Sequence, residues 1–222
     1  MKKIKSLFIT SVLVIGILIY AASTLGIINT PISSAAGMKK FQPTPWPPVI
    51  DQAYPDLELI DQNGKPFHLS DLKGKVIIIE PVGMSCAACQ AFSGAHEVGP
   101  FQNNPVQGGL LSFKEMVRTY AGGIKIPRRD IVFIQLILYD MQLQAPLPVH
   151  AQTWAEHFDF RTNENEIIAV SPYDLRSNVS YNLIPGFQLI DKNFILRSDS
   201  TGHNPRDDLY RMLLPMIPVA LR

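Results

Sequence analysis

The segment from Val76 to Cys89 reads VIIIEPVGMSCAAC and contains both cysteines of the chain. Its first four residues are β-branched, form too short a run for a helix, and show no alternation of apolar and polar side chains. This pattern predicts a central strand that is buried on both faces, as in a parallel α/β sheet. We expect a short turn after the strand and then a helix, with the two cysteines where that helix begins.

The cysteines form a predicted redox pair. Cys86 and Cys89 are separated by two residues, so they can close a small disulfide across the first turn of the helix. A helix N-terminus favours negative charge, and Cys86 should therefore ionise more readily than a free cysteine. Cys89 follows one turn later and can attack a mixed disulfide that forms on Cys86.

Glu80 follows the apolar run directly and is a candidate catalytic acid–base. A carboxylate at the end of a buried strand loses hydration on folding, which raises its pKa. Such a group can accept the proton that the Cys89 thiol loses during its attack and can return it in the reverse reaction. In the alternative interpretation, Glu80 has already left the sheet and is solvated at its edge.

Composition limits the classes of function that are open to the chain. The 222 residues include 20 basic and 19 acidic side chains, giving a net charge of +1. So small a net charge does not indicate the basic surface that binds nucleic acid, and we expect no nucleic-acid partner. Two cysteines cannot build a disulfide-rich scaffold or, without histidines, a four-ligand zinc site, so we predict neither a metal nor a cofactor.

The N-terminal region is predicted to anchor the chain in a membrane. Residues 1–6 carry three lysines, and the run Leu7–Ile28 contains no charge. At about 1.5 Å per residue this run spans roughly 33 Å, enough to cross a bilayer. The positive-inside rule keeps residues 1–6 in the cytoplasm and exports everything after Ile28. A cleavable signal peptide that ends before Gly37 is the alternative.

A globular domain is expected at residues 54–222, after a proline-rich linker at residues 29–53. A turn signal at Asp61–Gly64 predicts a hairpin, and a long insertion occupies about residues 90–123. Strands alternate with helices and a hairpin and helix close the chain, which predicts a three-layer α/β domain with a mixed central sheet. Beyond the first hairpin, the expected strands cover residues 76–79, 131–139, 167–170, 187–190 and 194–196, and the expected helices cover 90–98, 110–120, 150–158 and about 205–214.

The chain resembles the thioredoxin-like superfamily and, within it, the membrane-anchored, exported thiol–disulfide oxidoreductases. The resemblance runs from about Tyr54 to the C-terminus and depends on three features in order. They are the hairpin segment Leu59–Lys75, the cysteine pair after a buried strand, and Ile184-Pro185 ahead of a β-hairpin.

The resemblance implies a role for each matching residue. Cys86 is the nucleophile, Cys89 the resolving thiol, and Glu80, six residues before Cys86, matches a buried acid that relays a proton. Ile184 and Pro185 match the cis-proline loop that faces the disulfide and binds extended substrates. The implied partners are protein thiols or disulfides and a redox donor or acceptor protein. The implied location is a bacterial inner membrane, crossed once, with the catalytic domain on the periplasmic side.

Two departures from the family pattern leave the direction of electron flow open. Ser85 stands where the family usually has an aromatic residue, and Ala87-Ala88 is not one of the familiar dipeptides between the cysteines. A second function is also open, because the cysteine pair with Met84 resembles Cu(I)-binding loops and thioredoxin-like copper chaperones. A redox-inactive binding module on the same scaffold is the third possibility.

Overall fold

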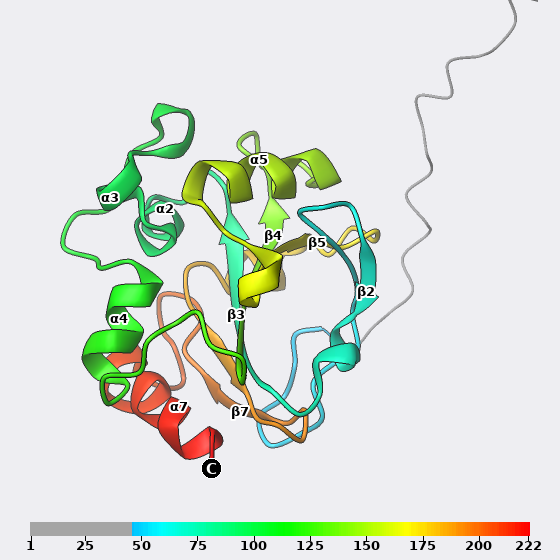
Figure 1. Ribbon diagram of the computed structural model, residues 1–222. Helices are drawn as coiled ribbons and strands as arrows, with labels where there is room; N and C mark the ends of the chain where they lie inside the picture. The colour runs from blue at the N-terminus through cyan, green and yellow to red at the C-terminus, as the bar shows by residue number, and fades with distance from the viewer. Residues whose placement is uncertain (1–45) are drawn as a thin grey trace, which may run out of the picture. The chain divides into compact units, whose positions relative to one another are not determined.

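The computed structural model describes residues 46–222, which form an α/β domain around one twisted sheet (Figure 1). The predicted cytoplasmic tail, the predicted anchor at residues 7–28 and most of the predicted linker lie outside the described residues. Across residues 46–222, every helix is too short or too polar to span a membrane.

The sheet has seven strands in the order β2-β1-β5-β4-β3-β6-β7. Three parallel strands form its centre, and their sequences are almost entirely apolar because both faces are covered. The remaining strands pair antiparallel, with the predicted hairpins at the two edges. The bounds are β1 Glu58–Asp61, β2 Pro66–His68, β3 Val76–Gly83, β4 Ile131–Tyr139, β5 Glu166–Val170, β6 Gln188–Ile190 and β7 Leu196–Asp199.

The helices are short and follow the predicted order. They are α2 Ala87–Ser93, α3 Ala95–Val98, α4 Phe113–Tyr120, α5 Pro148–Phe158, α6 Asn178–Tyr181 and α7 Leu214–Ala220. Single 3₁₀ turns lie at Leu69–Leu72, Phe101–Asn103 and Thr162–Glu164, and a π-helical segment at Leu209–Leu213 leads into α7. Short α6 has no counterpart among the predicted elements.

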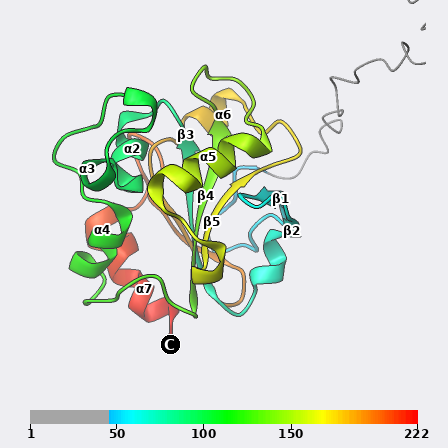
Figure 2. The ribbon, with the colours of Figure 1, turned by 45° about the horizontal axis from the view of Figure 1, so that its top comes forward.

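Helices α2, α4, α5 and α7 all pack on one face of the sheet (Figures 1 and 2). The crossovers β3-to-β4 and β4-to-β5 run in the same direction across the sheet and are both parallel connections, so a common handedness places their helices on the same side. The opposite face is covered by residues 46–57, the turn Leu69–Leu72 and Leu175. Both faces of the sheet are therefore covered, as three layers require. The layer opposite the helices, however, consists of irregular segments.

Several predicted element bounds were wrong, among them the last strand, which covers Leu196–Asp199 and not residues 194–196. The strand predicted at residues 76–79 continues to Gly83, so Glu80 lies inside β3 and not at its end. The helix predicted at residues 90–98 is divided at Gly94, whose φ of 107° ends α2 in a left-handed conformation. The last helix does not stop at Pro215, because the π-helical turn before it accommodates the proline near the start of α7.

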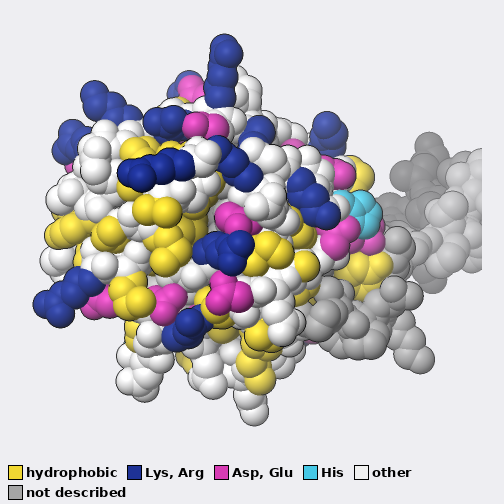
Figure 3. Space-filling model, turned by 90° about the horizontal axis from the view of Figure 1, so that it is seen from below, with side chains coloured by type: hydrophobic (Ala, Val, Ile, Leu, Met, Phe, Trp, Pro, Cys, Tyr) yellow, Lys and Arg dark blue, Asp and Glu magenta, His cyan; other side chains and the backbone are white. Residues whose placement is uncertain are grey.

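Charges of both signs are mixed on the surface of the domain. Figure 3 shows lysine and arginine side chains next to aspartate and glutamate on the face seen from below. Local ion pairs at the surface include Arg128 with Asp130 and Arg161 with Asp159. Such exposed pairs contribute little to stability.

Candidate active site

The cysteine pair lies where β3 gives way to α2, as the sequence predicts. Cys86 is the N-cap residue of α2, and its amide donates a hydrogen bond of 2.9 Å to the Gly83 carbonyl across the turn. Its Sγ accepts a hydrogen bond from the Cys89 backbone amide at 3.3 Å. Cys86 is partly exposed, whereas Cys89 faces the core and is fully buried. Only Cys86 is therefore accessible to a partner.

The partly exposed Cys86 is the more acidic of the two thiols, and the buried Cys89 is the less acidic one. The Cys89 thiol donates a hydrogen bond to Cys86, and together with the backbone amides of Cys89 and Ala88 it lowers the pKa of Cys86 to about 7. Burial, and then the neighbouring Cys86, raise the pKa of Cys89 well above the ordinary value for cysteine. At neutral pH the negative charge of the reduced pair thus lies on Cys86.

Glu80 is completely buried on the helical face of the sheet, between the core residues Ile78 and Val82 along β3. Burial raises its pKa well above 4.5, and a hydrogen bond from Gln135 offsets part of that rise. The interpretation of Glu80 as a solvated residue at the sheet edge is therefore wrong. The Glu80 carboxyl and the Cys89 thiol are close enough to perturb each other's pKa.

A network of buried polar side chains holds Glu80, and the sequence analysis missed it. Gln135 faces Glu80 in the register of β3 and β4, and its Nε2 donates to Glu80 Oε2 at 2.7 Å. The same Nε2 donates to Ser93 Oγ at 2.7 Å, while Gln135 Oε1 accepts from Trp154 Nε1 at 2.8 Å. One signal was available in the sequence, because Gln135 is the only strongly polar residue in the apolar run Ile131–Tyr139.

The Ile184–Pro185 segment lies beside Cys86, and its peptide bond is cis. Two backbone hydrogen bonds hold the loop in place. The Ile184 amide donates to the Tyr181 carbonyl at 3.2 Å, and the Pro185 carbonyl accepts from the Gly202 amide at 2.8 Å. Gly186 follows with φ of 150°, and a Cβ there would lie 2.3 Å from the Ser200 carbonyl oxygen. Only glycine fits this close approach of the two segments.

A cleft of 280 Å³ opens between Cys86 and this loop. Besides Cys86, Ile184 and Pro185, its walls include the apolar side chains of Leu143 and Tyr181, which are 49% and 54% exposed. Leu143 has a φ of 59°, and its carbonyl accepts a hydrogen bond from Arg176. The cleft is therefore apolar beside the nucleophile and wide enough for a few side chains.

The proposed copper ligands are only partly arranged for a metal. Met84 is 1% exposed and packs in the core, so its sulfur is not presented in the cleft. His203, which the sequence gave no reason to single out, lines the cleft together with Cys86. Within residues 46–222, no three side chains of the types histidine, cysteine, aspartate and glutamate form a cluster suited to a metal ion.

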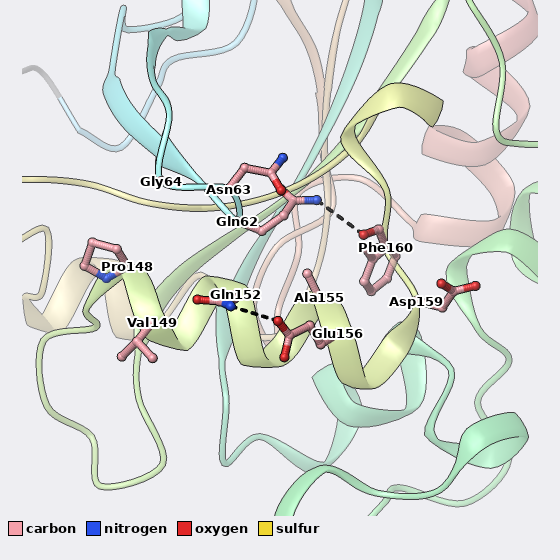
Figure 4. A pocket seen from close by; sticks show the side chains of 10 residues that line it. All are labelled: Gln62, Asn63, Gly64, Pro148, Val149, Gln152, Ala155, Glu156, Asp159 and Phe160. Atoms are coloured by element: carbon pink, nitrogen blue, oxygen red, sulfur yellow. Dashed lines mark hydrogen bonds between the residues drawn. The ribbon is translucent and has the colours of Figure 1, made fainter.

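A larger cavity of 540 Å³ lies elsewhere, between the turn after β1 and helix α5 (Figure 4). Amides dominate its polar lining: Gln62 donates to the Phe160 carbonyl, and Gln152 donates to Glu156. It contains no nucleophile and shares no lining residue with the cleft beside Cys86. Of these two hollows in the described part of the chain, only the smaller cleft contains a thiol.

No protein-family model and no curated protein matches the sequence. Among solved structures, a provisionally named electron transfer protein of Aquifex aeolicus matches with a TM-score of 0.50 and 16% identity over 78% of this chain and 97% of its own. A provisionally named protein disulfide isomerase of Bacteroides thetaiotaomicron matches with a TM-score of 0.50 and 14% identity over 78% of this chain and 90% of its own. Copper-bound ScoI of Arabidopsis thaliana matches with a TM-score of 0.46 and 13% identity over 74% and 97% of the two chains. The predicted thioredoxin-like α/β fold is confirmed, with a mixed seven-stranded sheet.

Proposed function

We propose that the chain is a thiol–disulfide oxidoreductase that exchanges a Cys86–Cys89 disulfide with protein thiols. The observation that carries the proposal is the contrast between the two cysteines: one is accessible with a pKa of about 7, and the other is buried beside a buried carboxyl. A structural cysteine pair needs neither the accessible, acidic thiol nor the buried acid. The thioredoxin-like neighbours support a redox role.

The chemistry proceeds in two exchanges. In the reducing direction, the Cys86 thiolate attacks one sulfur of a substrate disulfide, and the other sulfur leaves as a thiolate. Once Cys86 is in the mixed disulfide, its thiolate no longer raises the pKa of Glu80, and Glu80 can release its proton. The Cys89 thiol then gives its proton to the Glu80 carboxylate while its sulfur attacks Cys86. The Cys86–Cys89 bond forms, the mixed disulfide breaks, and two electrons have passed to the substrate. In the oxidising direction each step runs backwards, and Glu80 returns the proton to Cys89.

The substrate segment is proposed to bind at Ile184 and Pro185. Among residues 46–222, no donor reaches the Ile184 carbonyl, and the segment lines the cleft beside the Cys86 sulfur. An extended chain in the cleft can therefore donate a backbone hydrogen bond to this carbonyl while its cysteine meets Cys86.

Two measurements test the proposal. The protein should catalyse the reduction of insulin by dithiothreitol, and Cys86→Ser should abolish the catalysis. Equilibration with glutathione buffers should then give the potential of the couple and hence the direction of electron flow. A wild-type protein that does not accelerate insulin reduction in any buffer would refute the proposal and favour a redox-inactive module.

Transport of Cu(I) is the alternative proposal, and His203 is the observation that favours it. An imidazole and a thiolate in one cleft are both ligands that suit copper. A titration with Cu(I) in the presence of a competing chelator separates the two functions. Stoichiometric binding that is lost in both Cys86→Ser and His203→Ala would support copper transport.

We further propose that residues 7–28 anchor the protein in the inner membrane, with the catalytic domain on the periplasmic side. The proposal depends on the uncharged run behind three lysines. Full-length protein should remain in membranes after carbonate washing. A soluble exported species that begins near Gly37 would instead indicate a cleaved signal peptide.

A further inference from the structure

The buried network behind the cysteines has one consistent assignment of donors and acceptors, and the assignment starts at Trp154. An indole N–H can only donate a hydrogen bond. Its partner atom on Gln135, at 2.8 Å, must therefore be the amide oxygen. The NH₂ group of Gln135 consequently points the other way, and both of its hydrogens are used, toward Glu80 and Ser93.

Ser93 completes the assignment. Its hydroxyl donates to the Cys89 backbone carbonyl at 2.8 Å, so its oxygen is left to accept from Gln135. Every donor and acceptor of the Gln135 amide is thus satisfied in one orientation only. Gln135 and Trp154 are fully buried and Ser93 nearly so, and water therefore does not offer an alternative partner.

This orientation distinguishes the two oxygens of Glu80. Oε2 faces an N–H donor at 2.7 Å, and a proton on Oε2 pointing along this contact would compete with the amide hydrogen. Oε1 is buried and has no hydrogen-bonding partner among the described residues. Two ionisable groups act on Glu80: the charge of Cys86 raises its pKa, and the neighbouring Cys89 thiol lowers it. From the adjacent strands, β4 presents the neutral Gln135, and Gln188 of β6 bonds to Tyr54 and Asp199 instead.

We propose that Gln135, held in orientation by Trp154 and Ser93, is a positioning residue that makes Glu80 Oε1 the oxygen exchanging a proton with Cys89. During resolution, the S–H bond of Cys89 breaks and its proton goes to Oε1. The Cys89 sulfur bonds to Cys86, and the partner sulfur leaves with the electron pair of the broken mixed disulfide. Oε2 stays bound to the Gln135 amide throughout. This inference rests on the proposed thiol–disulfide exchange.

Trp154→Phe is the sharpest test, since it removes the indole donor and keeps an aromatic ring in the core. Without that donor the Gln135 amide can rotate and place its oxygen against Glu80. A carboxylate facing an amide oxygen is disfavoured, so Glu80 should hold its proton more tightly and on Oε2. Phe158→Leu is the matched control, because Phe158 packs against Trp154 from the same helix but leaves the indole N–H in place.

The assay uses Ellman's reagent with the full-length, reduced protein. The first thionitrobenzoate released reports the attack of Cys86, and the second reports resolution by Cys89. Trp154→Phe should slow the second phase by about two- to tenfold near neutral pH, the range expected for one hydrogen bond. Its pH profile should shift to higher pH, while the first phase stays unchanged. Ser93→Ala removes one acceptor of the Gln135 amide but leaves the Trp154 donor in place. It should therefore shift the pH profile in the same direction by less.

Infrared difference spectra provide a readout that a purely structural role would not change. The C=O band of protonated Glu80, identified by its loss in Glu80→Gln, should move in Trp154→Phe and stay in place in Phe158→Leu. Equal kinetics and an unshifted band in Trp154→Phe and Phe158→Leu would overturn the inference, and if Trp154→Phe does not fold, an unshifted Ser93→Ala would do so. Absence of any second phase in the wild-type protein would instead count against the proposed function.

Discussion

The burial of Glu80 has a cost in stability that depends on pH and can be measured directly. Its pKa in the folded protein is raised well above 4.5 by loss of hydration. Above pH 4.5 the unfolded chain therefore releases this proton while the folded protein keeps it, and increasing pH favours unfolding. The stabilising contribution of Glu80 is complete below its pKa in the unfolded chain and is lost as pH rises through its pKa in the folded protein.

Glu80→Gln removes this dependence and keeps an oxygen that can accept the hydrogen bond from Gln135. The free energy of unfolding of the variant relative to wild type should therefore rise by about 1.4 kcal/mol per pH unit above pH 4.5. The difference should stop growing once the pH exceeds the pKa of Glu80 in the folded protein. Below pH 4.5 the two proteins should keep a constant difference.

Urea denaturation of the two reduced proteins between about pH 4 and pH 6.5 is the appropriate assay. This range stops below the pKa of about 7 for Cys86, so the thiolate contributes little to the slope. Glu156→Gln is the control, because it makes the same change of side chain at an exposed position on α5. Parallel pH curves for wild type and Glu80→Gln would refute the argument that Glu80 is held protonated by burial.

Three further predictions concern the cleft and the cysteines. Alkylation of the reduced protein should label Cys86 first, with half-maximal rate near pH 7, and early labelling of Cys89 would reverse the assignment of roles. Glu80→Gln should slow the resolution step by roughly ten- to a thousandfold, about a decade below the usual range for a general acid–base, and leave the alkylation of Cys86 unchanged. A wild-type rate at every pH would exclude the relay. Tyr181→Ser removes an exposed apolar side chain from the wall of the cleft. It should raise the KM for peptide disulfides roughly three- to tenfold with little change in kcat, as expected for lost apolar contact. An unchanged KM would mean that substrates avoid this wall.

Local features of the sequence were sufficient to predict much of the site. The buried strand, the cysteine pair at the start of a helix and the cis Ile184–Pro185 bond all depend on residues that are adjacent in the chain. The strand at Ile131–Tyr139 was predicted with its exact bounds, because an apolar run of that length and composition has few other structures open to it.

Features that depend on tertiary packing could not be predicted. Gln135 bonds to side chains 55, 42 and 19 residues away, and no local pattern reveals that these chains meet. The same holds for the helices, whose placement on one face follows from the order of the strands and not from any single helix. The predicted helix end at Pro215 was wrong because a π-helical turn cancels the usual effect of proline as a helix breaker.

Cys86, Cys89 and Glu80 are best understood as one system that carries a limited negative charge. Cys86 ionises near pH 7, and its thiolate raises the pKa of Cys89 and of Glu80, both of which are buried. When the disulfide forms the thiolate disappears, so the pKa of Glu80 should fall. Reduction should therefore take up a proton at Glu80 in addition to those taken up by the thiols. The midpoint potential of the wild-type couple should then depend more steeply on pH than that of Glu80→Gln, and equal slopes from glutathione titrations would show that Glu80 does not sense the redox state.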